Sequence, residues 1–244
     1  MSSGSAVMDI DWGCEHVEMT ALANGSIRAC KVTVSDIGKL AQELTKTVVD
    51  TSWMSSLDKG ARRSYEKTVA ETADVLVKIF NAVPVSGSTT AIQEDFGELM
   101  VSMGAARALC RVFSHSEVPL AELWKPQVKQ NEGFDFHTVC ELEKINFGEA
   151  KYSAKKSPHG IALDQISDFL TAEKHFRDRP HLEKLVSPSA IANLDNEEFG
   201  IVAAFSVNAV NPDVVLANAM AKAKALAGTH QISQIYLVGV IHGP

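Results

Sequence analysis

The sequence predicts an α/β fold in which helices cover both faces of a sheet. Two uninterrupted apolar runs, from Phe199 to Val207 and from Ile235 to Ile241, are typical of strands that are buried on both faces. Other segments carry apolar residues at the spacing of an amphipathic helix. The second half of the chain is therefore expected to run helix, strands, helix, strand, helix, strand.

The first third is expected to form an α/β lead-in. Two strand-like runs, from His16 to Ala23 and from Ile27 to Val34, flank Asn24-Gly25, a pair that favours a tight hairpin turn. Ser35-Asp36 suits the start of a helix whose apolar positions recur at helical spacing. These positions are Ile37, Leu40, Leu44 and Val48. A second helix is expected from Ala61 to Phe80.

A change in composition marks the predicted domain boundary. The stretch from Val83 to Ser88 is rich in Pro, Gly and Ser, which predicts a division into residues 1–85 and residues 86–244. We interpret residues 1–85 as a partner-docking lobe. The next helix is expected from Thr90 to Phe113. It begins with acidic residues, as the helix dipole favours, and Glu94 and Glu98 lie one turn apart on one face.

Two short strands carry the most informative residues of the chain. Phe134-Asp135-Phe136 places an acid inside an apolar strand, and Glu149 follows fourteen positions after Asp135. Because alternate residues of a strand share a face, Glu149 and Lys151 are expected to project into one cavity while Ala150 turns into the core. A carboxylate such as Asp135 is expensive to bury alone, so a partner such as a metal ion is expected beside it.

The elements after this strand pair are simpler to assign. A helix is expected from about Gly160 to His175, followed by a linker that contains Arg179-Pro180 and Ser187-Pro188. Asn211-Pro212-Asp213 opens a helix that ends near Leu226. This helix joins the two uninterrupted apolar strands and completes the layered fold.

Composition limits the classes of function. The chain has 244 residues, of which 45% are hydrophobic and 22% charged, as in an ordinary globular protein. No apolar run approaches the roughly 18 residues of a membrane span and no secretory signal is recognisable, so we expect a cytoplasmic protein without a membrane partner. The sequence also lacks the motifs of ATP motors, dinucleotide enzymes and serine hydrolases.

The charge balance argues against tight nucleic-acid binding by this chain alone. Its formal net charge is -7, whereas phosphate binding depends on Lys and Arg. Lys155 and Lys156 follow the second strand and are candidate DNA contacts, although a solvated loop is the simpler interpretation. A basic partner protein would supply the missing affinity for DNA.

The strand pair suits metal-dependent hydrolysis of a phosphodiester. A divalent cation polarises a phosphoryl oxygen and lowers the pKa of bound water. Mg²⁺ usually takes one or two carboxylates and several waters, so Asp135 and Glu149 would suffice, with the Ala150 carbonyl as a further ligand. Mn²⁺ is the alternative ion. Lys151 would orient the attacking water and offset the charge that builds on the phosphate.

These residues resemble the site of the PD-(D/E)xK nuclease superfamily. The resemblance covers roughly Thr90 to the C-terminus and implies a restriction-endonuclease-like core of helix, three-strand meander, helix and strand. It assigns catalysis to Asp135, Glu149 and Lys151. Phe134 stands where the family's name has a proline, and this departure leaves the ligands intact.

The same resemblance adds two accessory positions. An acid on the first helix often completes the metal site, and Glu98 is its counterpart here, with Glu94 as the alternative. Gln165 matches a position on the following helix that often contacts DNA or supports the site.

More narrowly, three segments resemble HamA-type proteins, the small nuclease-like subunits of Hachiman antiphage defence. The segments are Gly97-Glu98-Leu99, Gly133-Phe134-Asp135-Phe136-His137 and Phe147-Gly148-Glu149-Ala150-Lys151-Tyr152. Proteins of this type work with a superfamily 2 helicase, HamB. The resemblance therefore implies an Mg²⁺-dependent DNA endonuclease subunit that acts with a HamB-like helicase.

Two other functions stay open from the sequence. The net charge and the sparse basic residues also suit a regulatory or scaffolding subunit that keeps a nuclease fold and restrains its helicase. The third function is a nuclease that works alone as a homodimer. The effect on partner ATPase activity separates the first alternative from a nuclease, and light scattering detects the dimer.

Overall fold

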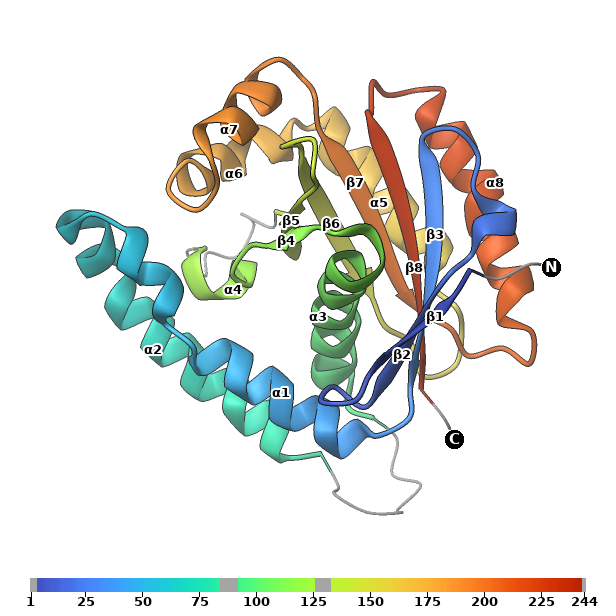
Figure 1. Cartoon of the computed structure of the whole chain (residues 1–244), viewed down its shortest axis with the longest axis horizontal. Coiled ribbons are helices and arrows are strands. Elements are labelled where there is room, and N and C mark those ends of the chain that lie inside the picture. Colours follow the sequence, from blue (N-terminus) through green and yellow to red (C-terminus); the bar gives the residue numbers. More distant parts are fainter. Residues whose placement is uncertain (1–3, 84–91, 126–132, 243–244) are drawn as a thin grey trace.

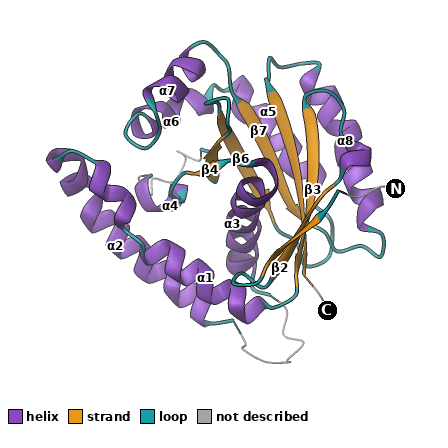
Figure 2. Ribbon diagram, in the orientation of Figure 1, coloured by secondary structure: helices purple, strands orange, loops and turns teal. Residues whose placement is uncertain are grey.

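A computed structural model describes residues 4–83, 92–125 and 133–242, and these form a mixed α/β structure (Figures 1 and 2). The expected α/β class is confirmed. The strands are β1 (Ala6–Asp9), β2 (Cys14–Glu18), β3 (Ile27–Val34), β4 (Ser116–Glu117), β5 (Phe136–Val139), β6 (Ile145–Lys151), β7 (Gly200–Ser206) and β8 (Gln234–His242). The helices are α1 (Ile37–Val49), α2 (Lys59–Asn81), α3 (Glu94–Phe113), α4 (Ala121–Trp124), α5 (His159–Thr171), α6 (Lys174–Leu182), α7 (Pro188–Asp195) and α8 (Pro212–Ala227). Two short 3₁₀ helices are η1 (Thr20–Leu22) and η2 (Ser52–Ser56).

All of these strands belong to one sheet, in the order β1-β2-β3-β8-β7-β6-β5-β4. The four central strands β3, β8, β7 and β6 are parallel, and the strands on either side of them are antiparallel. Ile27 of β3 lies opposite Ile235 of β8. The sheet therefore runs without interruption across the division predicted at residue 85.

Helices cover the two faces of the sheet. In Figure 1, α3 crosses one face, while α5 and α8 lie behind the strands on the other. Every residue of β7 is buried, which confirms the prediction of strands covered on both sides. None of the helices within the described ranges combines the length and the apolar character that a membrane crossing requires.

The N-terminal hairpin is confirmed, but its loop is longer than expected. The first strand ends at Glu18, which lies opposite Cys30, because the chain then turns into η1. The tight turn involves Asn24 and Ile27, whose backbone groups exchange hydrogen bonds of 2.9 and 3.0 Å. Gly25 within it has φ +59, a left-handed conformation that glycine adopts at little cost.

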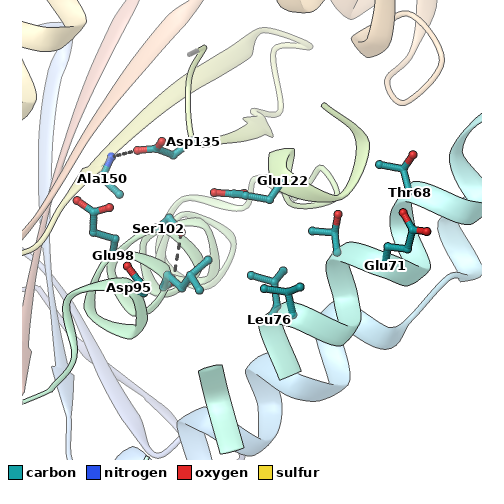
Figure 3. A pocket seen from close by; sticks show the side chains of 12 residues that line it. Thr68, Glu71, Leu76, Asp95, Glu98, Ser102, Glu122, Asp135 and Ala150 are labelled. Carbon is teal, nitrogen blue, oxygen red and sulfur yellow. Dashed lines mark hydrogen bonds between the residues drawn. The ribbon is translucent and has the colours of Figure 1, made fainter. Parts of the chain in front are cut away.

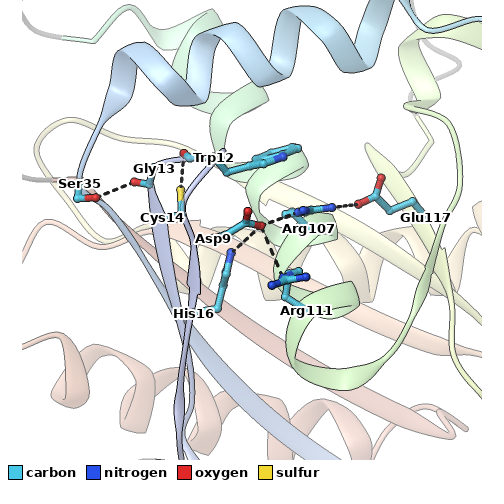
Figure 4. Close-up of polar contacts among 9 residues, drawn as sticks. All are labelled: Asp9, Trp12, Gly13, Cys14, His16, Ser35, Arg107, Arg111 and Glu117. Carbon is cyan, nitrogen blue, oxygen red and sulfur yellow. Dashed lines mark hydrogen bonds and ion pairs between the residues drawn. The ribbon is translucent and has the colours of Figure 1, made fainter.

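An ionic cluster ties this hairpin to α3 (Figure 4). Asp9 at the end of β1 is 4% exposed, and its Oδ2 accepts a 2.7 Å hydrogen bond from Nε of Arg107. Nε of Arg111 and Nε2 of His16 each lie 3.7 Å from the same oxygen. The arginine charges oppose the effect of burial and hold the pKa of Asp9 below its usual value. Strand β1, which the sequence did not predict, is thereby fixed to the main helix.

Helices α1 and α2 pack side by side and form an arm that reaches α3 and α4. The predicted start of α1 is confirmed, because Asp36 accepts a 3.0 Å hydrogen bond from the N–H of Lys39. The arm brings the middle of α2 opposite the N-terminal part of α3. A space opens between them, and the candidate site adjoins it.

The predicted linker between α5 and β7 is wrong. The structure has two helices there, α6 and α7, although both contain a proline. Pro188 occupies the first turn of α7, where backbone N–H groups make no hydrogen bonds within the helix, so the missing N–H of proline costs nothing there. Ser187 caps the helix, because its Oγ accepts a 3.1 Å hydrogen bond from the N–H of Ala190. Pro180 lies inside α6, whose buried Asp178 and Leu182 hold the helix in place.

The start of the predicted Thr90–Phe113 helix and its boundary segment are only partly described. Helix α3 begins at Glu94 and ends at Phe113, as predicted for its C-terminal end. Residues 84–91, which include most of the Val83–Ser88 boundary, lie outside the described residues.

Candidate active site

Asp135 is held at the point where β5 and β6 begin to pair. Phe136 is the register partner of Gly148, and the N–H of Asp135 also donates to the Gly148 carbonyl at 2.8 Å. Asp135 and Phe136 are thus both paired with Gly148, as two consecutive residues of a β-bulge are paired with one residue of the neighbouring strand. A β-bulge changes the direction in which side chains leave the strand. Oδ2 of Asp135 accepts a 2.7 Å hydrogen bond from the N–H of Ala150. Gly148 is required here, since a Cβ would lie 2.4 Å from the Phe136 ring.

Glu149 and Lys151 form an ion pair on β6. Nζ of Lys151 lies 2.7 Å from Oε1 of Glu149. The Glu149 side chain is 0% exposed, whereas Lys151 is 21% exposed, so the lysine alone reaches the surface. Oε2 of Glu149 is buried without a hydrogen-bond partner among the described residues. A buried carboxylate oxygen without a hydrogen bond is energetically unfavourable, and a bound cation would offset that cost.

The charges of the predicted site residues act on one another. Burial raises the pKa of Glu149 and the charge on Asp135 raises it further, while Lys151 opposes both effects. Burial lowers the pKa of Lys151, but the carboxylates of Glu149 and Asp135 outweigh this and raise it overall. The charges of Asp135, Glu149 and Lys151 are therefore coupled to one another.

A cavity of about 790 Å³ opens beside these residues, between the arm and α3 (Figure 3). Its acidic lining residues are Glu71 of α2, Asp95 and Glu98 of α3, Glu122 of α4 and Asp135. Thr68, Thr72, Val75, Leu76, Leu99, Ser102 and Ala150 complete the lining. No Lys, Arg or His lies among these described lining residues, so the cavity attracts cations and repels phosphates.

The residues of β6 differ in their relation to this cavity. Ala150 lines it, whereas Glu149 and Lys151 do not. Because side chains alternate along a strand, Glu149 and Lys151 leave β6 on the face away from Ala150, yet the charges of both act on Asp135 and Glu98, which line the cavity. Phe205, the register partner of Lys151, packs against His159 of α5 on that face. Ala150 is 2% exposed and belongs to the core, as expected, and its position on β6 also brings it to the lining of this cavity.

The remaining predicted residues are divided between the cavity and the surface. Glu98 lines the cavity, whereas Glu94 is not among its described lining residues. Gln165 is half-buried on α5, away from the cavity lining. Lys155 and Lys156 are exposed beyond β6, where their backbone N–H groups donate to Oγ of Ser153.

His137, which follows Asp135 by two residues, belongs to a separate buried cluster. Its Nε2 lies 3.0 Å from Oδ2 of Asp178, and Nζ of Lys125 lies 2.9 Å from the same oxygen. His137 is 0% exposed and burial lowers its pKa. It therefore supports the fold and is shielded from any substrate.

Glu122 is the main residue that the sequence analysis missed. It lies on the short helix α4 and its carboxyl is enclosed against the cavity, with no hydrogen-bond partner for Oε2 among the described residues. Burial raises its pKa to about 8, and the charge on Asp135 adds to the rise. A helix of four residues leaves no periodic signal in a sequence, so nothing marked Glu122 in advance.

The oxygen ligands suit a hard cation, but they do not form a complete cage. Among the described residues, no group of three or more His, Cys, Asp or Glu side chains is arranged to hold a metal ion. Mg²⁺ commonly uses only one or two carboxylates and completes its shell with water and substrate oxygens. Asp135 and the unpartnered oxygen of Glu149 fit that smaller requirement.

Comparison with protein-family models, with curated proteins and with solved structures finds no match to this chain.

Proposed function

We propose that the chain is an Mg²⁺-dependent DNA endonuclease subunit and that Asp135, Glu149 and Lys151 form its reacting site. The observation that carries the proposal is the buried Glu149–Lys151 ion pair beside Asp135, with one Glu149 oxygen left unpartnered among the described residues. Burial of a charged group typically costs several kcal/mol, roughly. A functional reason for keeping the buried Glu149 carboxylate is therefore expected.

Each residue has a distinct part in the proposed reaction. Asp135 and Glu149 hold the cation, with the Ala150 carbonyl and Glu98 as further oxygen ligands. A bound divalent cation would supply polarisation of the phosphoryl oxygen and a water of lowered pKa. Lys151 orients the attacking water and offsets the negative charge of the transition state, and its contact with Glu149 keeps the ammonium in position.

The carboxylate-lined cavity supports a role for a partner in DNA binding. DNA would be repelled by a wall that carries Glu71, Asp95 and Glu122, and the chain as a whole has a net charge of -7. A superfamily 2 helicase of the HamB type would supply the basic surface and deliver the strand to the exposed end of Lys151. In this proposal the complex acts in antiphage defence.

Two substitutions test the site without a large change of shape. Glu149→Gln removes a ligand charge, and Lys151→Met removes the ammonium. We expect each to abolish cleavage of single- and double-stranded DNA by the purified complex in Mg²⁺ or Mn²⁺. Glu71→Gln, on the far wall of the cavity, is the matched control and should cut normally. Wild-type cleavage by both site variants would refute the assignment.

A second function is favoured by the same cavity. Because its described lining contains five carboxylates and no basic side chain, the chain would also suit a regulatory subunit that restrains a helicase through protein contacts. ATP hydrolysis by the helicase, measured with and without this chain, separates the two functions. Restraint requires the ATPase rate to fall when the chain is added, including when the chain carries Glu149→Gln.

A further inference from the structure

Helices α2 and α3 meet at one end and diverge from there. Phe80, close to the end of α2, packs edge-on against Phe96 in the first turn of α3, with ring centroids 6.2 Å apart. Beyond this contact the cavity separates the two helices, and Figure 3 shows Glu71 and Leu76 on the α2 wall and Asp95 on the α3 wall. The cavity is therefore a groove with one helix on each side.

Both walls present residues at the spacing of one helix face. On α3 the lining residues Asp95, Glu98, Leu99 and Ser102 follow the pattern i, i+3, i+4 and i+7. The lining residues of α2 follow the same pattern from Thr68 to Val75 and continue to Leu76. This is the spacing through which helices contact another helix laid against them. The groove therefore matches a helix better than an extended segment, which needs an open sheet edge to bond its backbone.

The floor of the groove is apolar and partly uncovered. Val75 is 55% exposed although it lines the cavity, whereas Leu76 and Leu99, which also line it, are 5% and 7% exposed. Two turns of an α-helix about 10 Å across occupy about 850 Å³, which is close to the cavity volume of about 790 Å³. Burial of Val75 by an occupant of that size is favourable only if the occupant carries apolar side chains on one face.

The charges of the walls define the flanks of the occupant. The described lining contains carboxylates and no Lys, Arg or His. Glu71 is already paired with Lys67, whose Nζ lies 3.7 Å from its Oε1. Asp95 and Glu98 give the opposite wall its negative charge. A cationic segment is therefore attracted to the groove, and nucleic acid is repelled from it.

We propose that this groove binds a cationic amphipathic helix of a partner protein. Apolar side chains of that helix pack on Val75, Leu76 and Leu99, and Lys or Arg side chains on its flank reach Asp95 and Glu98. The inference goes beyond the proposed nuclease function, because neither a metal ion nor cleavage of DNA enters it. It also gives the arm a task, since α2 supplies one of the two walls.

A model peptide tests the groove directly. The probe is a fluorescein-labelled peptide of about fourteen residues, or roughly four helical turns, with leucine along one face, lysine beside it and alanine elsewhere. Fluorescence anisotropy with the full chain, in EDTA and at about 0.05 M salt, measures the affinity. Binding should weaken at about 0.5 M salt but persist in part, because the apolar contacts are not screened.

Substitutions on the two walls locate the peptide. Val75→Ser should weaken binding by about tenfold, because an apolar contact is lost. Val49→Ser is the matched control and should bind as the wild type does, since Val49 on α1 is 53% exposed and is not among the described lining residues. Asp95→Asn should weaken binding by about threefold at about 0.05 M salt. Glu66→Gln, exposed on α2 outside the described lining, should leave the affinity unchanged.

Two further peptides decide the outcome. One has the same composition with its leucines spread around the helix, and the other has glutamate in place of lysine. Each should bind at least about tenfold more weakly than the first peptide. Equal binding of all three, or wild-type affinity in Val75→Ser, would overturn the proposal. Displacement of the peptide by a single-stranded DNA oligonucleotide would also overturn it, because the groove would then be a nucleic-acid site.

This proposal and the nuclease assignment fail separately. Peptide binding is measured in EDTA, so Glu149→Gln should bind the peptide normally whether or not it cuts DNA. Absence of peptide binding would refute the groove and leave the cleavage test of Glu149 untouched. If Val75→Ser fails to fold, Val75→Thr, which keeps the shape of the side chain and makes it more polar, takes its place and should also weaken binding.

Discussion

The ring of Tyr152 lies against Gly97 so closely that a Cβ on the glycine would fall 2.3 Å from the ring. Gly97 precedes Glu98 on α3, and Tyr152 follows Lys151 at the end of β6. This contact therefore sets the distance between the helix and the strand that carry the site. Close packing of this kind leaves no room for an added methyl group.

Gly97→Ala should destabilise the protein and displace α3 from β6. Overpacking typically costs about 1–3 kcal/mol, and the shift should also lower DNA cleavage. Gly104→Ala on the same helix is the matched control, because its Cβ would meet no atom within 4 Å. It should be neutral or slightly stabilising. Urea unfolding of both variants measures the difference, and equal stabilities would contradict the packing argument.

Lys151→Met should be less stable than the double variant Glu149→Gln/Lys151→Met. The single change leaves a completely buried carboxylate without its counterion, which typically costs about 3 kcal/mol or more, whereas the double change removes both charges. The free energies of unfolding of the wild type, the two single variants and the double variant give the coupling energy between Glu149 and Lys151. A coupling near zero would show that the ion pair does not compensate the burial of Glu149.

Asp9→Asn should loosen the N-terminal hairpin from α3. It removes the acceptor of a 2.7 Å bond and leaves Arg107 and Arg111 facing each other without their shared carboxylate. A loss of about 2 kcal/mol is expected, since Arg107 keeps some contact with solvent. Lys67→Ala, which breaks an exposed pair with Glu71, should change stability by less than about 0.5 kcal/mol. Hydrogen exchange of β1 amides should rise only in Asp9→Asn.

Acidification should destabilise the protein through two buried histidines. Burial lowers the pKa of His16 to about 4 despite the nearby Asp9, and burial likewise lowers that of His115 to about 4. Unfolded histidine has a pKa of about 6.5, so the unfolded chain binds more protons between these values. The free energy of unfolding should therefore fall as the pH drops from about 6.5 to about 4.

His16→Gln isolates one of these contributions. Urea unfolding between about pH 7.5 and about pH 4.5 should show a dependence of the unfolding free energy on pH whose slope is shallower by up to about 1.4 kcal/mol per pH unit. Arg107 and Arg111 face His16 and also oppose its protonation, and their own contacts with Asp9 do not involve the histidine and should persist in the variant. Identical slopes for the variant and the wild type would contradict the lowered pKa of His16.

The elements that the sequence predicted well are those whose signal is local. Strands β7 and β8 are uninterrupted apolar runs, and α3 repeats apolar residues at helical spacing over five turns, roughly. A cap residue such as Asp36 accepts a hydrogen bond from a residue only three positions later in the sequence. Each of these features depends only on neighbours in the sequence, so one sequence is enough to find it.

The elements that were missed depend on distant contacts. The helix α6 persists around Pro180 because Asp178 binds Lys125 and His137, more than 40 residues away. The contact of Ala150 with Asp135 could not be predicted, because it depends on the pairing of two strands. Glu122 joins the site only through folding of α4 against the arm, which no local pattern encodes.

Strand β8 lies between β3 and β7 in the middle of the sheet, and Gln234 hydrogen-bonds to Ser26 across 208 residues of sequence. During translation, one edge of β3 stays unpaired until β8 has been synthesised. A ribosome that stalls before Gln234 would leave two bare parallel edges exposed to other nascent chains. The sheet can therefore form only after synthesis is complete. Prematurely terminated copies should aggregate or be degraded instead of forming the site.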